Sequence, residues 1–156
     1  MRPGSIYASF GSKEGLFKET LQHYADDSLA LLKSYAKENE SPLAALREFL
    51  TSVVVNQKQA PSNMCMLVKT ISELTDDNAE LLADAKQLLG GVELEFAKLF
   101  TQAQARGELD GSKDPKRLAS LLQMQLMGLR AYVRANEGSD QEIKALTDDA
   151  FTSLVE

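Results

Sequence analysis

The sequence predicts an all-α protein. Two observations carry this prediction: apolar residues recur every three or four positions along nearly the whole chain, and helix-start and helix-end signals divide that pattern into segments. Alternation of apolar and polar residues over the length of a strand is hard to find, and the nearest candidate is the run 51–55. That run lies inside a helical pattern from Leu43 to Val54, so we assign it to a helix. With 156 residues, the chain is long enough to bury one core.

The first half of the chain contains two clear helix starts. Ser12 is suited to cap a helix whose apolar face continues to about Ala36. Ser41 followed by Pro42 is a second start, because serine accepts a bond from a free helical N–H and proline suits the first helical position. This second helix should end near Pro61, and a short helix is expected over 63–74.

The second half predicts three more helices. Asp76 and Asp77 open the longest one, and Gly107 closes it as a C-terminal glycine. Gly90-Gly91 lies in its middle, where a bend or a close helix contact is expected. Asp114-Pro115 starts the next helix, and Ser139 or Asp140 caps the last one after a polar turn. On the helix that starts at Asp114, the residues expected to face inward are Leu118, Leu121, Leu122, Leu126, Leu129 and Val133.

Composition and charge exclude several classes of protein. A net charge of −6 argues against a nucleic-acid coat or a membrane-surface protein that acts through bulk charge. A single cysteine cannot form an internal disulfide, so a reducing compartment is expected. No run approaches the roughly 20 apolar residues of a membrane span, and the N-terminus has no signal-peptide core. The sequence therefore predicts a cytoplasmic protein with no membrane partner.

No pattern in the sequence indicates catalysis. The chain has one histidine, His23, and one cysteine, Cys65, and nothing in the sequence brings them together. No histidine, cysteine or carboxylate residues have metal-ligand spacing, so no metal and no cofactor are expected. Paired aspartates are assigned to helix caps and solvated faces, and His23 to a partly buried position near an apolar helix face. We predict that the protein is not an enzyme.

The N-terminal segment has the character of a DNA-reading element. Pro3 suits the first turn of a short helix, and Gly4 and Ser5 give that helix a bare surface for close approach. The helix breaks at Gly11, and the next one begins at Ser12 with free N–H groups that suit a phosphate. A short helix with a small-residue face, followed by an anion-binding helix start, is how a helix-turn-helix meets DNA.

The order of residues in this segment resembles the second half of the DNA-binding domain of TetR-family transcriptional repressors. In that family a Gly-(Ser/Thr)-(Leu/Ile)-Tyr recognition helix leads into Phe-x-(Ser/Asn)-Lys-Glu-x-Leu. Here the stretch from Gly4 to Leu16 reads GSIYASFGSKEGL. Gly15 and the pair Ala8-Ser9 depart from the family pattern, which affects the expected base preference. The long all-α remainder is similar to the family's ligand-binding domain, so the resemblance implies a TetR-type helical bundle with a partial N-terminal helix-turn-helix.

The resemblance also implies two domains and an absent segment. Family members carry two further helices before this point, so we expect a truncated chain with impaired DNA binding. Residues 1–24 are expected to be the remnant of the helix-turn-helix, and residues 25–156 the effector-binding and dimerisation domain. In the complete protein, operator DNA would meet Arg2, Gly4, Ser5, Tyr7 and Lys13.

Two functions remain open at this point: a ligand-responsive repressor, or a helical dimerising module that binds neither DNA nor an effector. A repressor should have a pocket for an apolar small-molecule effector, with methionines as adaptable walls. The expected lining residues are Phe49, Val53, Met64, Met66, Phe96, Met124 and Met127.

Assembly and redox chemistry complete the expectations. We expect a homodimer in which the last two helices, over 114–135 and 140–155, pair with their symmetry mates. Cys65 lies near a helix start, where a thiol with a lowered pKa would serve as a redox sensor, although an inert buried cysteine is the alternative. The expected interface residues are Leu122, Met127, Leu129, Tyr132, Ala150 and Leu154.

Overall fold

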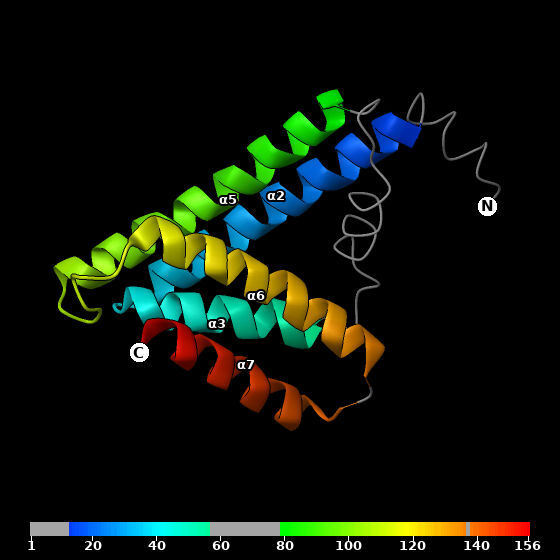
Figure 1. Cartoon of the computed structure of the whole chain (residues 1–156). Coiled ribbons are helices and arrows are strands. Elements are labelled where there is room, and N and C mark those ends of the chain that lie inside the picture. The colour runs from blue at the N-terminus through cyan, green and yellow to red at the C-terminus, as the bar shows by residue number, and fades with distance from the viewer. Residues whose placement is uncertain (1–12, 57–78, 137) are drawn as a thin grey trace.

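The computed structural model describes residues 13–56, 79–136 and 138–156, and these residues form five helices without a strand. The helices form one bundle, in which α2 and α5 extend beyond the other three (Figure 1). The short helix expected over 63–74 lies outside the described residues. The helix bounds are α2 Lys13–Glu38, α3 Pro42–Val55, α5 Ala79–Ala105, α6 Pro115–Ala135 and α7 Asp140–Val155.

Three of the predicted helix starts are confirmed, whereas those at Ser12 and Asp76-Asp77 lie outside the described residues. The Ser41 side chain accepts a hydrogen bond from the Ala44 N–H at 3.1 Å, with Pro42 in the first turn. Asp114 accepts from the Lys116 N–H at 3.0 Å and is likewise followed by proline. Ser139 caps α7 in a reciprocal capping box with Glu142.

The helix ends match the sequence in part. Gly107 has a φ of +76°, and its N–H donates to the Gln104 carbonyl at 3.0 Å just beyond the end of α5. Helix α3 ends at Val55, before the expected Pro61. Helix α5 continues through Gly90-Gly91, and a Cβ atom at either position would meet nothing within 4 Å. A close helix contact at these glycines is therefore not found among the described residues, and the alternative expectation, a bend, stays a prediction.

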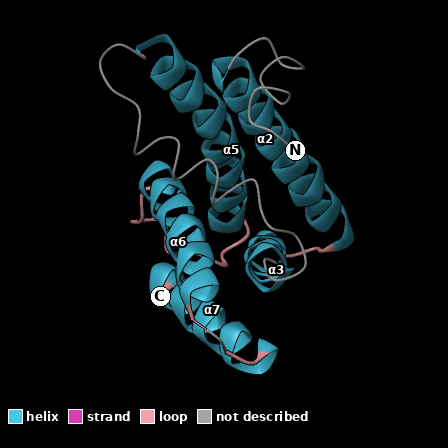
Figure 2. Cartoon of the chain, turned by 90° about the vertical axis from the view of Figure 1, so that its right-hand side faces the viewer, coloured by secondary structure: helices cyan, strands magenta, loops and turns pink. Residues whose placement is uncertain are grey.

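Two views show how the helices pack. Helices α2 and α5 lie side by side and run in the same direction, while α6 runs back along α5 (Figures 1 and 2). Helix α3 packs against α2, α5, α6 and α7, so it contacts every other described helix. None of the described helices is both long and apolar enough to cross a bilayer.

The buried apolar side chains form two groups. The larger group, here called the main core, joins α3, α5, α6 and α7 with part of α2, and its phenylalanines are fully buried. The smaller group, here called the α2–α5 cluster, lies between the N-terminal halves of α2 and α5. Its buried members are Phe17, Leu21, Tyr24, Leu81 and Ala85, with Leu88, Leu89 and Met127 packed against them.

Candidate functional site

Several predicted site residues lie outside the described part of the chain. Lys13 is the first residue of α2, where the helix is described and the side chain is not. Helix α2 continues without a break across the expected domain boundary at residues 24 and 25. The predicted residues outside the described ranges are Arg2, Gly4, Ser5 and Tyr7 for DNA, Met64 and Met66 for the effector, and Cys65 for redox sensing.

The other predicted effector residues do not gather in one place. Phe49 and Phe96 are fully buried in the main core, with ring centroids 5.7 Å apart. Val53 is half-buried against the same core, whereas Met127 packs against the α2–α5 cluster. Met124 is 66% exposed, so its assignment to a pocket wall is wrong because its helical position turns it to solvent.

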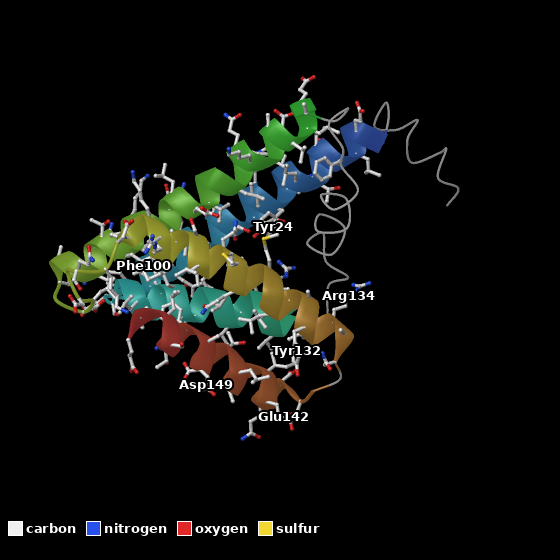
Figure 3. The ribbon with its side chains drawn as sticks, in the orientation of Figure 1. Tyr24, Phe100, Tyr132, Arg134, Glu142 and Asp149 are labelled. Atoms are coloured by element: carbon white, nitrogen blue, oxygen red, sulfur yellow. The ribbon has the colours of Figure 1, made fainter. Side chains whose placement is uncertain are left out.

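The residues predicted to form the dimer interface differ in how far they are exposed. Leu122 is fully buried inside the subunit, so its assignment to the dimer surface is wrong. Leu129 and Leu154 are half-buried and pack on the main core, and Ala150 is also half-buried. Tyr132 is 54% exposed near the end of α6 (Figure 3).

An exposed apolar stripe nevertheless follows α6. Leu121 was expected to face inward but is 39% exposed, and Met124 and Tyr132 are more exposed still. Together with Gly128, whose Cβ position is open, these residues recur at helical spacing and share one face. We call Leu121, Met124, Gly128 and Tyr132 the α6 stripe. On α7, Leu146 is 48% exposed one turn before Ala150, whose carbonyl accepts a bond from Gln125 of α6 at 2.8 Å.

An open groove of about 590 Å³ lies between helices α3 and α7. It was not predicted from the sequence. Arg47 crosses it, pairs with the Asp148 carboxylate, donates to Thr152 Oγ1 at 3.1 Å and lies 4.7 Å above the centre of the Phe151 ring. These contacts already engage the guanidinium, so we interpret Arg47 as a clamp between the two helices. The groove is lined by Tyr35, Arg47, Glu48, Thr51, Ser52, Val55, Asn56, Lys144 and Asp148.

Buried polar side chains meet between α2 and α6. Tyr24 and Gln123 are each 4% exposed, and the tyrosine hydroxyl donates to Gln123 Oε1 at 3.4 Å. Ser28, one turn along α2 from Tyr24, is also buried. Gln123 Nε2 is buried and has no hydrogen-bond partner among the described residues. We call Tyr24, Ser28 and Gln123 the polar cluster (Tyr24 is labelled in Figure 3).

The electrostatics of the polar cluster follow from its burial. Desolvation raises the pKa of the Tyr24 hydroxyl to about 12, while the positive charge of Arg130 and a hydrogen bond with Ser28 act in the opposite direction. The hydroxyl therefore stays neutral at physiological pH and keeps its proton for Gln123. Arg130 lies on the same face of α6 as Gln123, two turns further along, and is half-buried.

The surroundings of the polar cluster are apolar. Tyr24 belongs to the α2–α5 cluster, and Met127 of α6 packs against that cluster one turn beyond Gln123. Helices α2 and α6 both pack against α5, and their backbones do not pack closely on each other. The side chains of Tyr24 and Gln123 span the space between them. The polar cluster is therefore a small group of polar side chains inside an apolar region, a combination that small-molecule sites also have.

Sequence reasoning missed Gln123 and Ser28, although a signal was available. Gln123 follows Ala119 and precedes Leu126 and Met127 at helical spacing, so an amide occupies an inward position of an apolar face. His23 is a further correction: its side chain is 62% exposed and lies 3.2 Å from Glu19, because its position turns away from the apolar face of α2.

Comparison with known proteins is consistent with this architecture. The family model for the tetracyclin repressor-like C-terminal domain matches residues 42–147. The HTH-type transcriptional repressor ComR of Escherichia coli (strain K12) is 27% identical over 141 residues, which are 88% of this chain. The match covers 66% of ComR, so the chain spans slightly less than two thirds of that relative.

Solved structures share the fold. Two structures of cysteine mutants of the TetR family transcriptional regulator CifR, both complexed with 26-bp operator DNA, superpose with TM-scores of 0.75 and 0.74. Each is 24% identical to this chain and covers 98% of it, and the match covers 80% of the CifR chain. The family model spans more than half of the chain and the helices have the matching arrangement. The chain therefore belongs to the TetR family, a family of transcriptional regulators and not of enzymes.

Proposed function

We propose that this chain is the effector-binding and dimerisation part of a ligand-responsive TetR-type repressor, and that its effector binds at the polar cluster between α2 and α6. Family membership supports the regulatory role. ComR is named a transcriptional repressor and the CifR structures hold operator DNA, which supports operator DNA as the partner of the complete protein. The alternative is a helical dimerising module without an effector or DNA.

The buried amide of Gln123 is the observation that favours an effector. Leaving a buried donor without an acceptor costs about 1–3 kcal/mol, so a bundle built for stability alone would place an apolar side chain there. Such a group is expected where a ligand supplies the missing partner. A second buried atom without a partner among the described residues is Gln125 Oε1, on the side of α6 that faces α7, where the same amide donates from Nε2 to the Ala150 carbonyl at 2.8 Å.

The position of the polar cluster suggests how binding would reach DNA. Helix α2 carries Tyr24 and Ser28, and its first residue follows directly on the segment that resembles a recognition helix. A ligand inserted between α2 and α6 would shift α2 relative to the main core, and that shift would move the DNA-reading segment.

The effector site is tested by thermal-shift screening of the full chain against apolar small molecules. We expect ligands whose stabilisation falls in Gln123→Met and Tyr24→Phe and persists in Arg47→Met, the matched change in the α3–α7 groove. Ligands that depend on Arg47 and ignore Gln123 would contradict the proposed location. A screen without any ligand would favour the dimerising module.

We also propose that the homodimer forms through the α6 stripe and the exposed side of α7. Leu121, Met124 and Tyr132 expose more apolar surface than a solvated helix needs, and Leu146 of α7 adds to it. Met124→Glu should convert a dimer into a monomer in light scattering, because a buried unpaired charge is costly at an interface. Leu94→Glu, at a leucine of α5 that is 55% exposed, is the matched control and should leave the dimer intact. A wild-type monomer at micromolar concentration would contradict the proposal.

Weak DNA binding by these 156 residues alone stays a prediction. Isolated helices below about 12–15 residues are marginal in water, and a recognition helix needs packing partners to hold its angle in the groove. Fluorescence anisotropy with DNA from around the gene, at about 0.15 M salt, measures it by comparing this chain with one extended at its N-terminus. Tight sequence-specific binding by the shorter chain would contradict the prediction.

A further inference from the structure

The α6 stripe lies on a stretch of helix without any charge. Residues 118–129 contain no aspartate, glutamate, lysine or arginine. Leu121 and Met124 are nevertheless exposed, and at Gly128 no side chain covers the backbone. A helix face that meets only water normally carries charged side chains, so this face is suited to an apolar partner.

The order of large and small residues makes the α6 stripe complementary to a second copy of itself. When two identical helices pair about a two-fold axis, residues at equal distances on either side of the axis meet each other. Met124 and Gly128 lie two residues to either side of position 126. Leu121 lies five residues before that position and Tyr132 six residues after it. An axis at the level of position 126 therefore gives every member of the stripe a counterpart in the second copy.

Gly128 supplies the space that this pairing needs. A Cβ atom built at Gly128 would meet nothing within 4 Å, so its backbone is open to a side chain from outside the subunit. Met124 is 66% exposed and has an unbranched, adaptable side chain that can pack on such a backbone. The two-fold axis repeats this contact, since each copy contributes one methionine and one glycine.

Helix α7 adds an apolar residue at the same level. Gln125 donates to the Ala150 carbonyl at 2.8 Å, which fixes how α7 lies along α6, to which it runs antiparallel (Figure 1). Leu146, one turn before Ala150, therefore lies near the level of position 129 of its own α6. With the axis at position 126, that level faces the second copy close to its Met124. The exposed side chain of Leu146 would then be covered by the same partner.

We infer that the two-fold axis of the homodimer crosses α6 at the level of position 126, so that Met124 of each copy packs on Gly128 of the other. Leu121 of each copy then contacts Tyr132 of the other. This inference rests on the homodimer proposed above and adds which residues of the two copies meet.

The test exchanges the large and the small residue across the interface. Gly128→Met places a methionine opposite Met124 of the other copy and should raise the dissociation constant of the dimer at least about tenfold in analytical ultracentrifugation. Met124→Ala removes the packed side chain and should also weaken the dimer. The double variant restores one large and one small residue at each contact, so its dissociation constant should return to within about threefold of wild type.

The fold of the subunit and a matched glycine provide the controls. Because the Cβ position of Gly128 is open, Gly128→Met should keep the helical circular dichroism signal and should not lower the temperature of unfolding. Gly91→Met makes the same change at a glycine of α5 whose Cβ position is also open, and it should leave the dissociation constant unchanged.

The outcomes separate this inference from the proposed homodimer. A dimer that Gly128→Met does not weaken, or weakens no more than Gly91→Met does, would overturn the contact between Met124 and Gly128. A dimer that Gly128→Met weakens and the double variant does not restore would overturn the position of the axis, as expected if the two glycines faced each other. The homodimer itself would still stand in these cases, and both proposals would fall if the wild-type protein were a monomer at micromolar concentration.

Discussion

The main core and the α2–α5 cluster have opposite characters. The main core holds Phe49, Phe96, Phe100 and Phe151 without exposed surface, and its buried hydroxyl at Thr147 has a partner. The α2–α5 cluster is smaller and shares Tyr24 with the polar cluster, where Gln123 Nε2 lacks a partner among the described residues. The same helices α5 and α6 contribute to both regions.

This difference separates stability from binding within one bundle. Close packing of large side chains stabilises the main core, and the loss of a single aromatic ring there leaves a cavity. In the polar cluster, a buried donor without a partner lowers the free energy of unfolding. A ligand with an acceptor atom can supply the missing partner. The comparison leads to predictions about the cost of a substitution in each region.

The largest effect is expected in the main core. Phe96→Ala should lower the free energy of unfolding by about 3–5 kcal/mol, because it removes a fully buried ring that contacts Phe49. Urea unfolding followed by circular dichroism measures this. Met127→Ala in the half-buried wall of the α2–α5 cluster should cost about 1 kcal/mol. A stable Phe96→Ala that has lost effector binding would instead make this ring a pocket wall.

Tyr24 gives the next largest effect, at alkaline pH. Its pKa is about 12 in the folded protein against 10.0 as the ordinary value, so the unfolded chain releases this proton first. The stabilisation is fully present below pH 10. It declines by roughly 2–3 kcal/mol as the pH rises from 10 to about 12.

Comparison of the unfolding free energies of wild type and Tyr24→Phe over that range isolates this contribution. The variant should lose less stability than wild type, and parallel profiles would show that Tyr24 is not buried as described. At neutral pH the variant should be weakened only by about 1 kcal/mol, through the lost bond to Gln123.

A smaller effect is expected at the α3–α7 clamp, on the edge of the main core. Arg47→Met should lower the free energy of unfolding by about 1 kcal/mol, since it removes the pair with Asp148 and the contact above Phe151. The pair is partly exposed, so the loss should shrink at high salt. Arg117→Met at an exposed position of α6 is the matched control, with an expected change within about 0.5 kcal/mol. If the free energy of unfolding fell equally in both variants, the contacts of Arg47 between α3 and α7 would not stabilise the fold.

The sequence predicted the fold far better than the site. Helix starts at Ser41, Asp114 and Ser139 follow from local capping chemistry, and the structure has all three. Packing between helices is not local, so Leu121 was expected inside and is exposed, and Leu122 was expected at a dimer surface and is buried.

The polar cluster shows why the site was harder to find. Tyr24 comes from α2 and Gln123 from α6, and their hydrogen bond joins residues 99 positions apart in the chain. Methionine was the expected marker of the pocket, yet of the two methionines that the structure describes, Met124 faces solvent and Met127 contacts the α2–α5 cluster. A buried amide on an apolar face was the informative signal, and its partner was visible only after folding.

The free energy of unfolding of Gln123→Met without ligand tests most directly whether the polar cluster serves binding rather than folding. Methionine has a similar length and removes a buried amide whose Nε2 lacks a partner among the described residues. We predict that the free energy of unfolding of Gln123→Met equals that of wild type or is higher by up to about 1 kcal/mol, and that effector binding is weaker. A loss of about 3 kcal/mol, comparable to that of Phe96→Ala, would show that Gln123 stabilises the fold and would contradict the account.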